Sequence, residues 1–211
     1  MPLYKTITVT PSITVYIWKV EESEDELSEE ITLTPHCQNR LDQMKSEQHR
    51  RGFLSIRNLM AVANYTDADL FYTDDGKPHL KDGKHISITH SHHFTGIIIA
   101  DTDEVGIDIE KQRDKILTIA HKFTQPDEYR TLANTDAVVR KLTVVWGAKE
   151  SLYKIYAQKG LSFLHHIDVK EFSIDTDEES IAEIMYEGQH SAYSIDFLEF
   201  EGFTCVYAIK L

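Results

Sequence analysis

The segment from Val105 to Glu110 alternates apolar residues with others, and this alternation constrains the fold more than any other feature of the sequence. Successive side chains of a strand point to opposite faces. In a strand here, Val105, Ile107 and Ile109 would face one side, while Asp108 and Glu110 would face the other. The segment therefore predicts a strand that is buried on one face and carries two carboxylates on the other.

The strongest helical pattern of the chain follows at residues 137–157. Residues four apart share one face of a helix, so Trp146, Glu150 and Lys154 form a single stripe. The predicted inner face consists of Leu142, Val145, Lys149, Leu152 and Tyr156, with Lys149 as its polar exception. Three carboxylates and an ammonium on two rigid elements suit a magnesium-dependent reaction of a phosphate ester. Magnesium prefers oxygen ligands and is usually held by a few carboxylates together with substrate phosphates.

In the other segments, the order strand, helix, strands occurs twice along the chain. The second occurrence begins near Asp101. This order predicts an α+β chain of two similar halves. Before Asp101 we expect strands in 6–19, helix in 35–64, a strand and turn in 71–80, and strands at 85–89 and 96–100. After it we expect interrupted helix in 117–135 and strands at 169–174, 182–186, 191–200 and 203–209.

Composition excludes several classes of protein. A length of 211 residues allows one large domain or two small ones, and the formal net charge of −13 argues against nucleic acid or an anionic membrane as partner. The longest aliphatic run, Ile97–Ala100, is too short to cross a bilayer, and the N-terminus lacks the pattern of a secretory signal. Two cysteines, Cys37 and Cys205, form neither a disulfide framework nor a zinc pattern. We therefore expect a cytoplasmic protein.

Each candidate motif also has an ordinary structural explanation when it is taken alone. Asp108 and Glu110 could lie on the wet face of a half-buried strand, and Glu150 and Lys154 could be a helix-surface pair. His90 could bind a phosphate or make a structural hydrogen bond at the end of a strand. Gly76-Lys77-Pro78 could bring backbone and charge to a ligand, or could simply form a turn.

The order of these motifs is more specific than any one of them. In sequence they are Gly76-Lys77-Pro78, Ser87-Ile88-Thr89-His90-Ser91, Gly106-Ile107-Asp108-Ile109-Glu110, Phe123 with Glu128, Trp146-x-x-Lys149-Glu150-Ser151-x-x-Lys154, and Lys159-Gly160-Leu161-Ser162. This order resembles the 4′-phosphopantetheinyl transferase superfamily, in its long single-chain type, over roughly residues 45–172. The basic segment 45–57 is also similar to the family's N-terminal helix.

The resemblance implies a fold of two α/β halves related by pseudo-twofold symmetry, with coenzyme A in the cleft between them. Residues 1–101 would form the half that binds the adenine and 3′-phosphate. Residues 102–211 would carry the magnesium site and the catalytic helix. The implied reaction moves the 4′-phosphopantetheine arm of coenzyme A to a serine hydroxyl of an apo acyl or peptidyl carrier protein, and releases adenosine 3′,5′-bisphosphate. The implied enzyme is a monomer that needs Mg²⁺.

The family's catalytic roles carry over to the second half. Asp108, Glu110 and Glu150 match the magnesium ligands. Glu150 also matches the proposed general base, acting directly or through a water. Lys154 matches the lysine that contacts the phosphates, and Lys149 would lie near the pyrophosphate as a second cation.

The family's coenzyme A contacts carry over to the first half. His90 matches the ligand of the 3′-phosphate, with Thr89 and Ser91 beside it, and Lys77 and Pro78 match the segment that lines the adenine pocket. Some relatives carry an arginine before Gly-Lys-Pro, but residues 69–73 contain no basic residue. The 3′-phosphate would then rely on His90 together with Arg50, Arg51 or Arg57.

Two other functions stay open beside the transferase. One is a non-catalytic coenzyme A-binding protein, and the other is a hydrolase or regulator that acts on the arm of holo-carrier proteins. Because the chain and carrier proteins are both acidic, docking of a carrier would depend on an apolar patch with local cations. The candidate cations are Arg130, Arg140 and Lys141.

Overall fold

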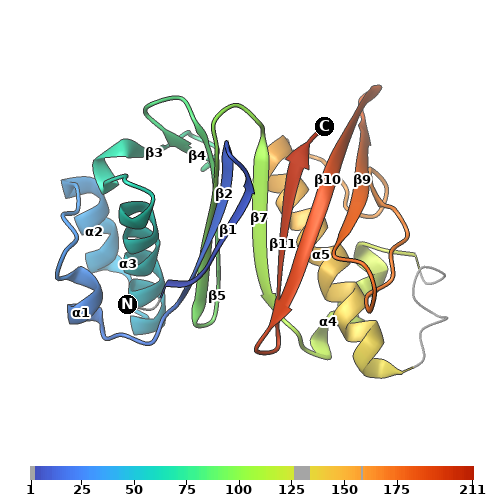
Figure 1. The fold of residues 1–211 in the computed structure, drawn as a ribbon, viewed down its shortest axis with the longest axis horizontal. Coiled ribbons are helices and arrows are strands. Elements are labelled where there is room, and N and C mark those ends of the chain that lie inside the picture. The colour runs from blue at the N-terminus through green and yellow to red at the C-terminus, as the bar shows by residue number, and fades with distance from the viewer. Residues whose placement is uncertain (1–2, 126–133, 158) are drawn as a thin grey trace. The chain divides into compact units, whose positions relative to one another are not determined.

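The computed structural model describes residues 3–125, 134–157 and 159–211. The chain divides into two compact units, Met1–Asp103 and Glu104–Leu211. Each unit combines an antiparallel sheet with helices (Figure 1). The predicted mixed α+β class is therefore confirmed.

The first unit contains a four-stranded antiparallel sheet in the order β1-β2-β6-β5. Its strands are β1 (Leu3–Thr10), β2 (Ile13–Lys19), β5 (His85–Ser91) and β6 (Phe94–Ala100). A two-residue turn joins β5 to β6, so both strands reach further than the sequence predicts and His90 lies within the sheet. A small ribbon of β3 (Leu70–Tyr72) and β4 (Pro78–Leu80) follows a short 3-10 turn, η1 (Asp67–Asp69).

Three helices accompany this sheet. They are α1 (Glu24–Ser28), α2 (Pro35–Gln43) and α3 (Glu47–Val62). The predicted helical stretch 35–64 is divided because Ser46 leaves helical geometry and its hydroxyl caps α3 by accepting from the His49 N–H. The apolar face of α3 packs on the sheet and forms one core with it, including Leu54, Leu59, Ile97 and Ile99.

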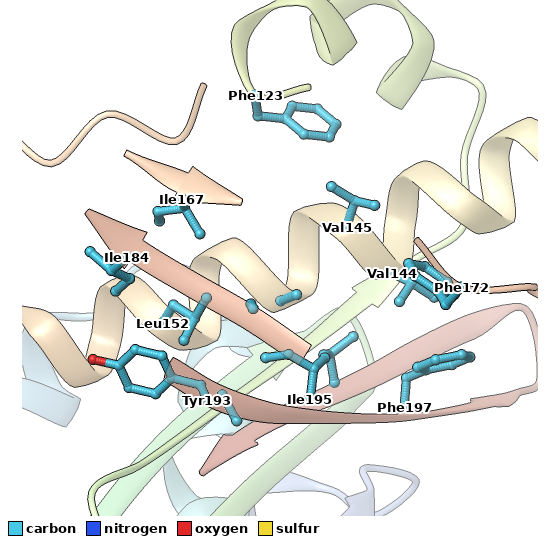
Figure 2. Packing of buried hydrophobic residues seen from close by; sticks show 14 of the residues in the cluster. Phe123, Val144, Val145, Leu152, Ile167, Phe172, Ile184, Tyr193, Ile195 and Phe197 are labelled. Atoms are coloured by element: carbon cyan, nitrogen blue, oxygen red, sulfur yellow. The ribbon is translucent and has the colours of Figure 1, made fainter. Parts of the chain in front are cut away.

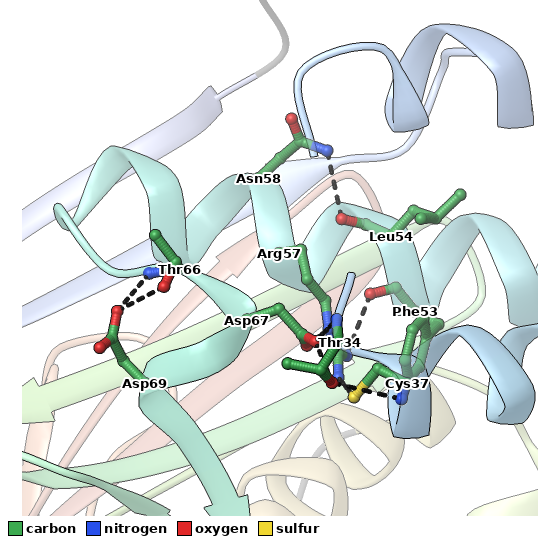
Figure 3. Close-up of polar contacts among 9 residues, drawn as sticks. All are labelled: Thr34, Cys37, Phe53, Leu54, Arg57, Asn58, Thr66, Asp67 and Asp69. Carbon is green, nitrogen blue, oxygen red and sulfur yellow. Dashed lines mark hydrogen bonds and ion pairs between the residues drawn. The ribbon is translucent and has the colours of Figure 1, made fainter. Parts of the chain in front are cut away.

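A buried ion pair fixes the chain that leaves α3. The Arg57 Nε donates to Asp67 Oδ1 over 2.9 Å, and both side chains are almost fully buried. The other Asp67 oxygen accepts from the Thr34 backbone and hydroxyl, each at 2.8 Å (Figure 3). These hydrogen bonds outweigh burial, so the pKa of Asp67 is lowered. The network ties α2, α3 and η1 together.

The second unit contains a five-stranded antiparallel sheet in the order β7-β11-β10-β9-β8. Its strands are β7 (Val105–Lys111), β8 (Ile167–Val169), β9 (Glu179–Tyr186), β10 (Gln189–Phe200) and β11 (Phe203–Lys210). Glu187-Gly188 and Glu201-Gly202 form the two hairpin turns, with positive φ at both residues of each pair, as type I′ turns require. The predicted strand at 169–174 is wrong, because β8 ends at Val169.

The long helix α5 (Thr135–Tyr156) packs across this sheet, mainly on β7 and β11 (Figure 1). Asn134 caps its start by accepting from the Ala137 N–H over 2.9 Å, and Ala157 ends it with φ +50°. Val144 and Leu152 on α5 meet Tyr193 and Ile195 on β10 in the core (Figure 2).

Short helical segments precede α5. They are α4 (Lys115–Ile119) and the 3-10 turn η2 (Ala120–Lys122). The expected break near Pro126 and the candidate residues Glu128 and Arg130 lie outside the described residues. Among the described helices, none has both the length and the apolar composition needed to cross a lipid bilayer.

The two units share one connectivity. In each, a strand is followed, after short helices, by a long helix and, after further short elements or strands, by a hairpin whose second strand pairs antiparallel with the first strand. In the first unit this path is β2, α3, β5 and β6. In the second unit it is β7, α5, β10 and β11. The predicted likeness of the halves therefore holds for their topology, while the twofold relation between them stays a prediction.

Candidate active site

Strand β7 presents two carboxylates toward α5. Its alternation follows the sequence pattern, since Ile107 and Ile109 are buried on the opposite face. Asp108 is 7% exposed and pairs in register with Val206 of β11, whereas Glu110 is half-buried near the end of the strand. The backbone of the sheet therefore fixes the spacing of Asp108 and Glu110.

Helix α5 approaches these carboxylates unusually closely, because small residues line its contact with the sheet. A Cβ on Gly106 would lie 2.0 Å from the Ser151 carbonyl oxygen. A Cβ on Gly147 would lie 2.7 Å from Val206 Cγ2 and 3.9 Å from Asp108 Oδ2. The Ser151 hydroxyl donates to the Val206 carbonyl over 3.1 Å. This contact brings Glu150 and Lys154 of the helix to the carboxylates of β7.

The electrostatics show that the three carboxylates share one region. Burial and the nearby negative charges of Asp108 and Glu110 raise the pKa of Glu150 to about 7, while Lys154 opposes the shift. Burial and Asp108 also raise the pKa of Glu110, against the effects of Trp146, Arg113 and Lys154. The carboxylates therefore repel one another in a partly buried place, and burial contributes most to both shifts.

Lys154 is the cation within this group. Its Nζ donates to Asp108 Oδ1 over 2.9 Å and to the Ile107 carbonyl over 2.7 Å. The ammonium therefore lies directly beside the predicted metal ligands. Any phosphate that Lys154 contacts would lie beside Asp108 as well.

The donor set fits a hard divalent cation by its chemistry, because it offers carboxylate oxygens in a partly buried site. The side chains are not arranged as a finished metal site. Among the residues that the structure describes, no three His, Cys, Asp or Glu side chains are positioned to hold an ion. Metal binding by Asp108, Glu110 and Glu150 would thus require side-chain rotation.

Trp146 adjoins the carboxylates, and the sequence only suggested this place for it. It lies one turn before Glu150 and lines one cavity with Glu110, where hydrogen bonding by the indole lowers the pKa of Glu110. The indole ring contacts the rings of Phe123 and Phe163, with centroids 5.1 Å and 5.5 Å away. Trp146 thereby orients a carboxylate of the neighbouring strand. In the sequence, the only indication was that Trp146 precedes Lys149 and Glu150 and shares a helix face with Glu150 and Lys154.

The structure contradicts the predicted role of Lys149. Its side chain is only 3% exposed, and its ammonium donates to the carbonyls of Phe123, Phe163 and Ile167 over 2.5, 2.7 and 2.8 Å. The rotation of 100° per residue that puts Glu150 at the site puts Lys149 on the inner face of α5. Lys149 is therefore a core residue and not a cation placed for the pyrophosphate.

The first unit has a separate cavity of about 300 Å³ beside His90. It is lined by Met44, His49, Gly52, Phe53, Ile56, Arg57, Tyr72, Ile88 and His90. The rings of His49 and His90 meet edge to face at 5.9 Å, and a Cβ on Gly52 would lie 3.1 Å from the His90 ring. An apolar wall with aromatic rings and two imidazoles suits a flat, polar-edged ligand.

Other predicted coenzyme A contacts are distributed unevenly around this cavity. Thr89 and Ser91 are buried and point to the face of β5 opposite His90, so the structure does not bring them together with it. Lys77 lies in the turn between β3 and β4, and Pro78 begins β4 opposite Tyr72, whose ring lines the cavity. Lys77 and Pro78 therefore adjoin a wall of the cavity without lining it.

The arginines of α3 differ in their availability to a phosphate. Arg57 is locked to Asp67, and Arg50 donates to Glu24 over 2.7 Å and to the Met44 carbonyl over 2.9 Å. Arg51 is partly exposed, and its Nη2 donates to the Val20 carbonyl over 3.3 Å. Of the three, Arg51 is the one whose described contacts include no ion pair.

The predicted docking cations are engaged within the second unit. Arg140 pairs with Glu199 and Asp175, and Lys141 is 5% exposed and donates to the Phe172 carbonyl. Their part in docking a carrier therefore stays a prediction, and Lys141 offers little exposed surface for it. Lys111, Arg113 and Lys115 instead line a cavity of about 170 Å³ that also includes Glu110 and Trp146.

Comparison with known proteins places this arrangement in a family. The model of the 4′-phosphopantetheinyl transferase superfamily matches residues 104–208. The 4′-phosphopantetheinyl transferase ffp of Bacillus subtilis is 29% identical over 156 residues, which cover 70% of this chain and 67% of the relative. A second 4′-phosphopantetheinyl transferase of Bacillus subtilis is 33% identical over 127 residues, which cover 56% of each protein.

The matched part of the chain thus spans between about half and two thirds of these relatives. The family model covers nearly the whole second unit, including the three carboxylates, Trp146 and Lys154. The chain belongs to the 4′-phosphopantetheinyl transferase superfamily. This membership places it among the transferases and confirms the resemblance seen in the sequence.

Proposed function

We propose that the chain transfers the 4′-phosphopantetheine arm of coenzyme A to a serine hydroxyl of an apo acyl or peptidyl carrier protein, with Mg²⁺ as cofactor. The observation that carries this proposal is the group of Asp108, Glu110, Glu150 and Lys154 on β7 and α5. Burial, and after it the repulsion between the carboxylates, raises the pKa values of Glu110 and Glu150, and a bound divalent cation would favour their charged forms. A protein that only binds coenzyme A has no need of this group.

The chemistry assigns a task to each side chain. Asp108, Glu110 and Glu150 would hold Mg²⁺, which would supply charge neutralisation for the pyrophosphate of coenzyme A. The serine oxygen forms a bond to the phosphorus of the phosphopantetheine arm. The bond from that phosphorus to the bridging oxygen of the pyrophosphate breaks, and adenosine 3′,5′-bisphosphate leaves. Glu150, directly or through a water, accepts the proton of the serine.

Lys154 and a cavity of the first unit are assigned the remaining contacts of the substrate. The Lys154 ammonium, held beside Asp108, stabilises negative charge on the phosphates as they pass through the loose transition state. We assign the adenine and 3′-phosphate to the first unit, at the cavity of His90 and Tyr72, with Lys77 and Pro78 nearby and Arg51 as an accessory cation. Thr89 and Ser91 have no assigned contact, and we expect the working enzyme to be a cytoplasmic monomer.

Release of adenosine 3′,5′-bisphosphate tests this reaction against its two alternatives. With coenzyme A and Mg²⁺, we expect this product only when an apo carrier protein is present, as measured by liquid chromatography. Its release without a carrier would indicate a hydrolase of coenzyme A. Binding of coenzyme A without release, on several apo carriers, would favour the non-catalytic binder. Release of phosphopantetheine from a holo-carrier would favour the hydrolase of the arm.

The cations beside Glu110 predict where an acidic carrier docks. We expect the variant Lys111→Glu/Lys115→Glu to raise KM for the carrier about tenfold and to leave KM for coenzyme A nearly unchanged, because like charges across an interface repel. Arg113 is kept because its charge acts on Glu110. The control is Lys81→Glu, an exposed lysine of the first unit. Equal KM values for the carrier in both variants would contradict this docking site.

A further inference from the structure

We propose that Lys149 is a positioning residue that holds Trp146, and through Trp146 the Glu110 carboxylate, in place for metal binding. Its three donated hydrogen bonds join three separate segments to α5. One acceptor follows η2, the second lies between α5 and β8, and the third begins β8. Figure 2 shows Phe123 and Ile167 reaching α5 from two of these segments. Burying a lysine ammonium costs free energy even when all three of its N–H groups donate hydrogen bonds. Hydrophobic packing alone would not require a lysine at this position.

Two of the three acceptors belong to the residues whose rings contact Trp146. Lys149 binds the carbonyls of Phe123 and Phe163, and the side chains of the same two residues pack on the indole. Trp146 and Lys149 are also three positions apart on α5, so they share one side of the helix. The ammonium therefore sets the backbone positions from which both rings restrain the indole.

The restrained indole then acts on the metal site. Trp146 lines one cavity of about 170 Å³ together with Glu110, the half-buried carboxylate at the end of β7, and hydrogen bonding by the indole lowers the pKa of Glu110. Groups that hydrogen-bond a metal ligand fix its orientation, and their loss typically weakens metal affinity 10–100-fold. The path from Lys149 through the phenylalanines to Trp146 is continuous in hydrogen bonds and ring contacts, and Trp146 and Glu110 line the same cavity. The link to the metal rests on the proposed function, whereas the restraint of Trp146 does not.

Lys149→Met tests the proposal because it removes the three donors and keeps most of the side-chain volume. In a Trp18→Phe background, Trp146 is the only tryptophan. In metal-free protein we expect Lys149→Met to shift the emission of Trp146 to longer wavelength and to make it more easily quenched by iodide. By calorimetric titration we expect its dissociation constant for Mg²⁺ to rise about tenfold or more.

Lys141→Met is the matched control, since Lys141 is a second buried lysine of α5 that donates to a backbone carbonyl and contacts a phenylalanine ring. It should leave both readouts unchanged. Trp146→Phe should weaken Mg²⁺ binding by itself, and adding Lys149→Met to it, in the natural Trp18 background, should weaken binding little further. Additive losses would overturn the proposal, because they would mean that Lys149 does not act through Trp146.

Phe163→Leu provides a second route if Lys149→Met does not fold. It removes one ring contact to the indole and leaves the backbone carbonyls in place, so we expect the same direction of change in Trp146 emission and Mg²⁺ affinity. Folded variants at Lys149 and Phe163 that match Lys141→Met in both readouts would overturn the proposal. Failure of the natural protein to bind Mg²⁺ would contradict the proposed function, and the emission of Trp146 would still decide whether Lys149 restrains the indole.

Discussion

Glu150→Gln is expected to lower the rate of arm transfer by roughly 10²–10⁴-fold, the usual contribution of a positioned general base. The amide has nearly the same shape as the carboxylate but carries no charge and cannot accept the serine proton. Binding of coenzyme A should fall by less than about tenfold, because the proposed adenine site lies in the first unit. Single-turnover rates and equilibrium titration with coenzyme A separate the two effects.

The same variant is expected to be more stable than the natural protein when metal is absent and the pH is above 7. The pKa of Glu150 is raised from 4.5 to about 7 in the folded protein. Between these values the folded chain holds a proton that the unfolded chain has lost, so the free energy of unfolding falls as pH rises. Glutamine does not ionise, so the free energy of unfolding of the variant does not fall for this reason. The advantage of Glu150→Gln should therefore grow from pH 4.5 to 7 and then level off.

Added Mg²⁺ should reverse this order of stability. The metal would stabilise the natural protein through three carboxylates and the variant through two, so the natural protein should gain more in Tm. Glu30→Gln serves as the control, since Glu30 is an exposed glutamate of the first unit and its change should alter stability by no more than about 0.5 kcal/mol. Full transfer activity in Glu150→Gln would rule out its role as a base.

Gly106→Ala is expected to destabilise the second unit by about 3 kcal/mol, the upper range for an overpacked contact. The new Cβ would lie 2.0 Å from the Ser151 carbonyl oxygen and 3.1 Å from Ile155 Cγ1. The first clash is with backbone, so α5 itself must move away from β7. A shift of Glu150 by about 1 Å relative to Asp108 should lower transfer about a hundredfold in the fraction that stays folded.

Urea unfolding and transfer rates at 15 °C would measure the two effects of Gly106→Ala, at a temperature chosen near the usual maximum of stability, ~10–20 °C. Gly52→Ala is the matched control for stability. Its Cβ would meet only the movable ring of His90 at 3.1 Å, and alanine is favoured over glycine within a helix by roughly 1 kcal/mol. We expect Gly52→Ala to be neutral or stabilising. A stability loss as large in Gly52→Ala as in Gly106→Ala would contradict the close contact of α5 as the cause.

The sequence predicts the elements that carry the three candidate carboxylates better than it predicts the chain around them. Periodicity identifies β7 and α5 because each has one apolar face, and the outward residues then follow from geometry. It fails at residues 170–174, where apolar Phe172 and Ile174 alternate as in a strand but pack into the core from a loop. Burial alone does not distinguish a strand from an irregular segment.

Lys149 shows why residue roles are harder to predict than elements. Its neighbours in sequence, a tryptophan and a glutamate, suggested a cation at the site. Its position on the inner face of the predicted helix suggested a buried residue instead, and Lys149 is buried in the structure. The deciding interactions join Lys149 to carbonyls 14 to 26 residues away, which no local pattern reveals. The close approach at Gly106 has the same long-range character.

Intact-mass spectrometry of an apo acyl carrier protein tests the central claim most directly. The carrier would be incubated with this protein, coenzyme A and Mg²⁺, alongside a sample with EDTA and one with Glu150→Gln. We predict a gain of one phosphopantetheine arm in the complete reaction, and no gain in either of the other two samples. An unmodified carrier in the complete reaction, across fatty acid, polyketide and peptide carriers, would contradict the proposed transfer.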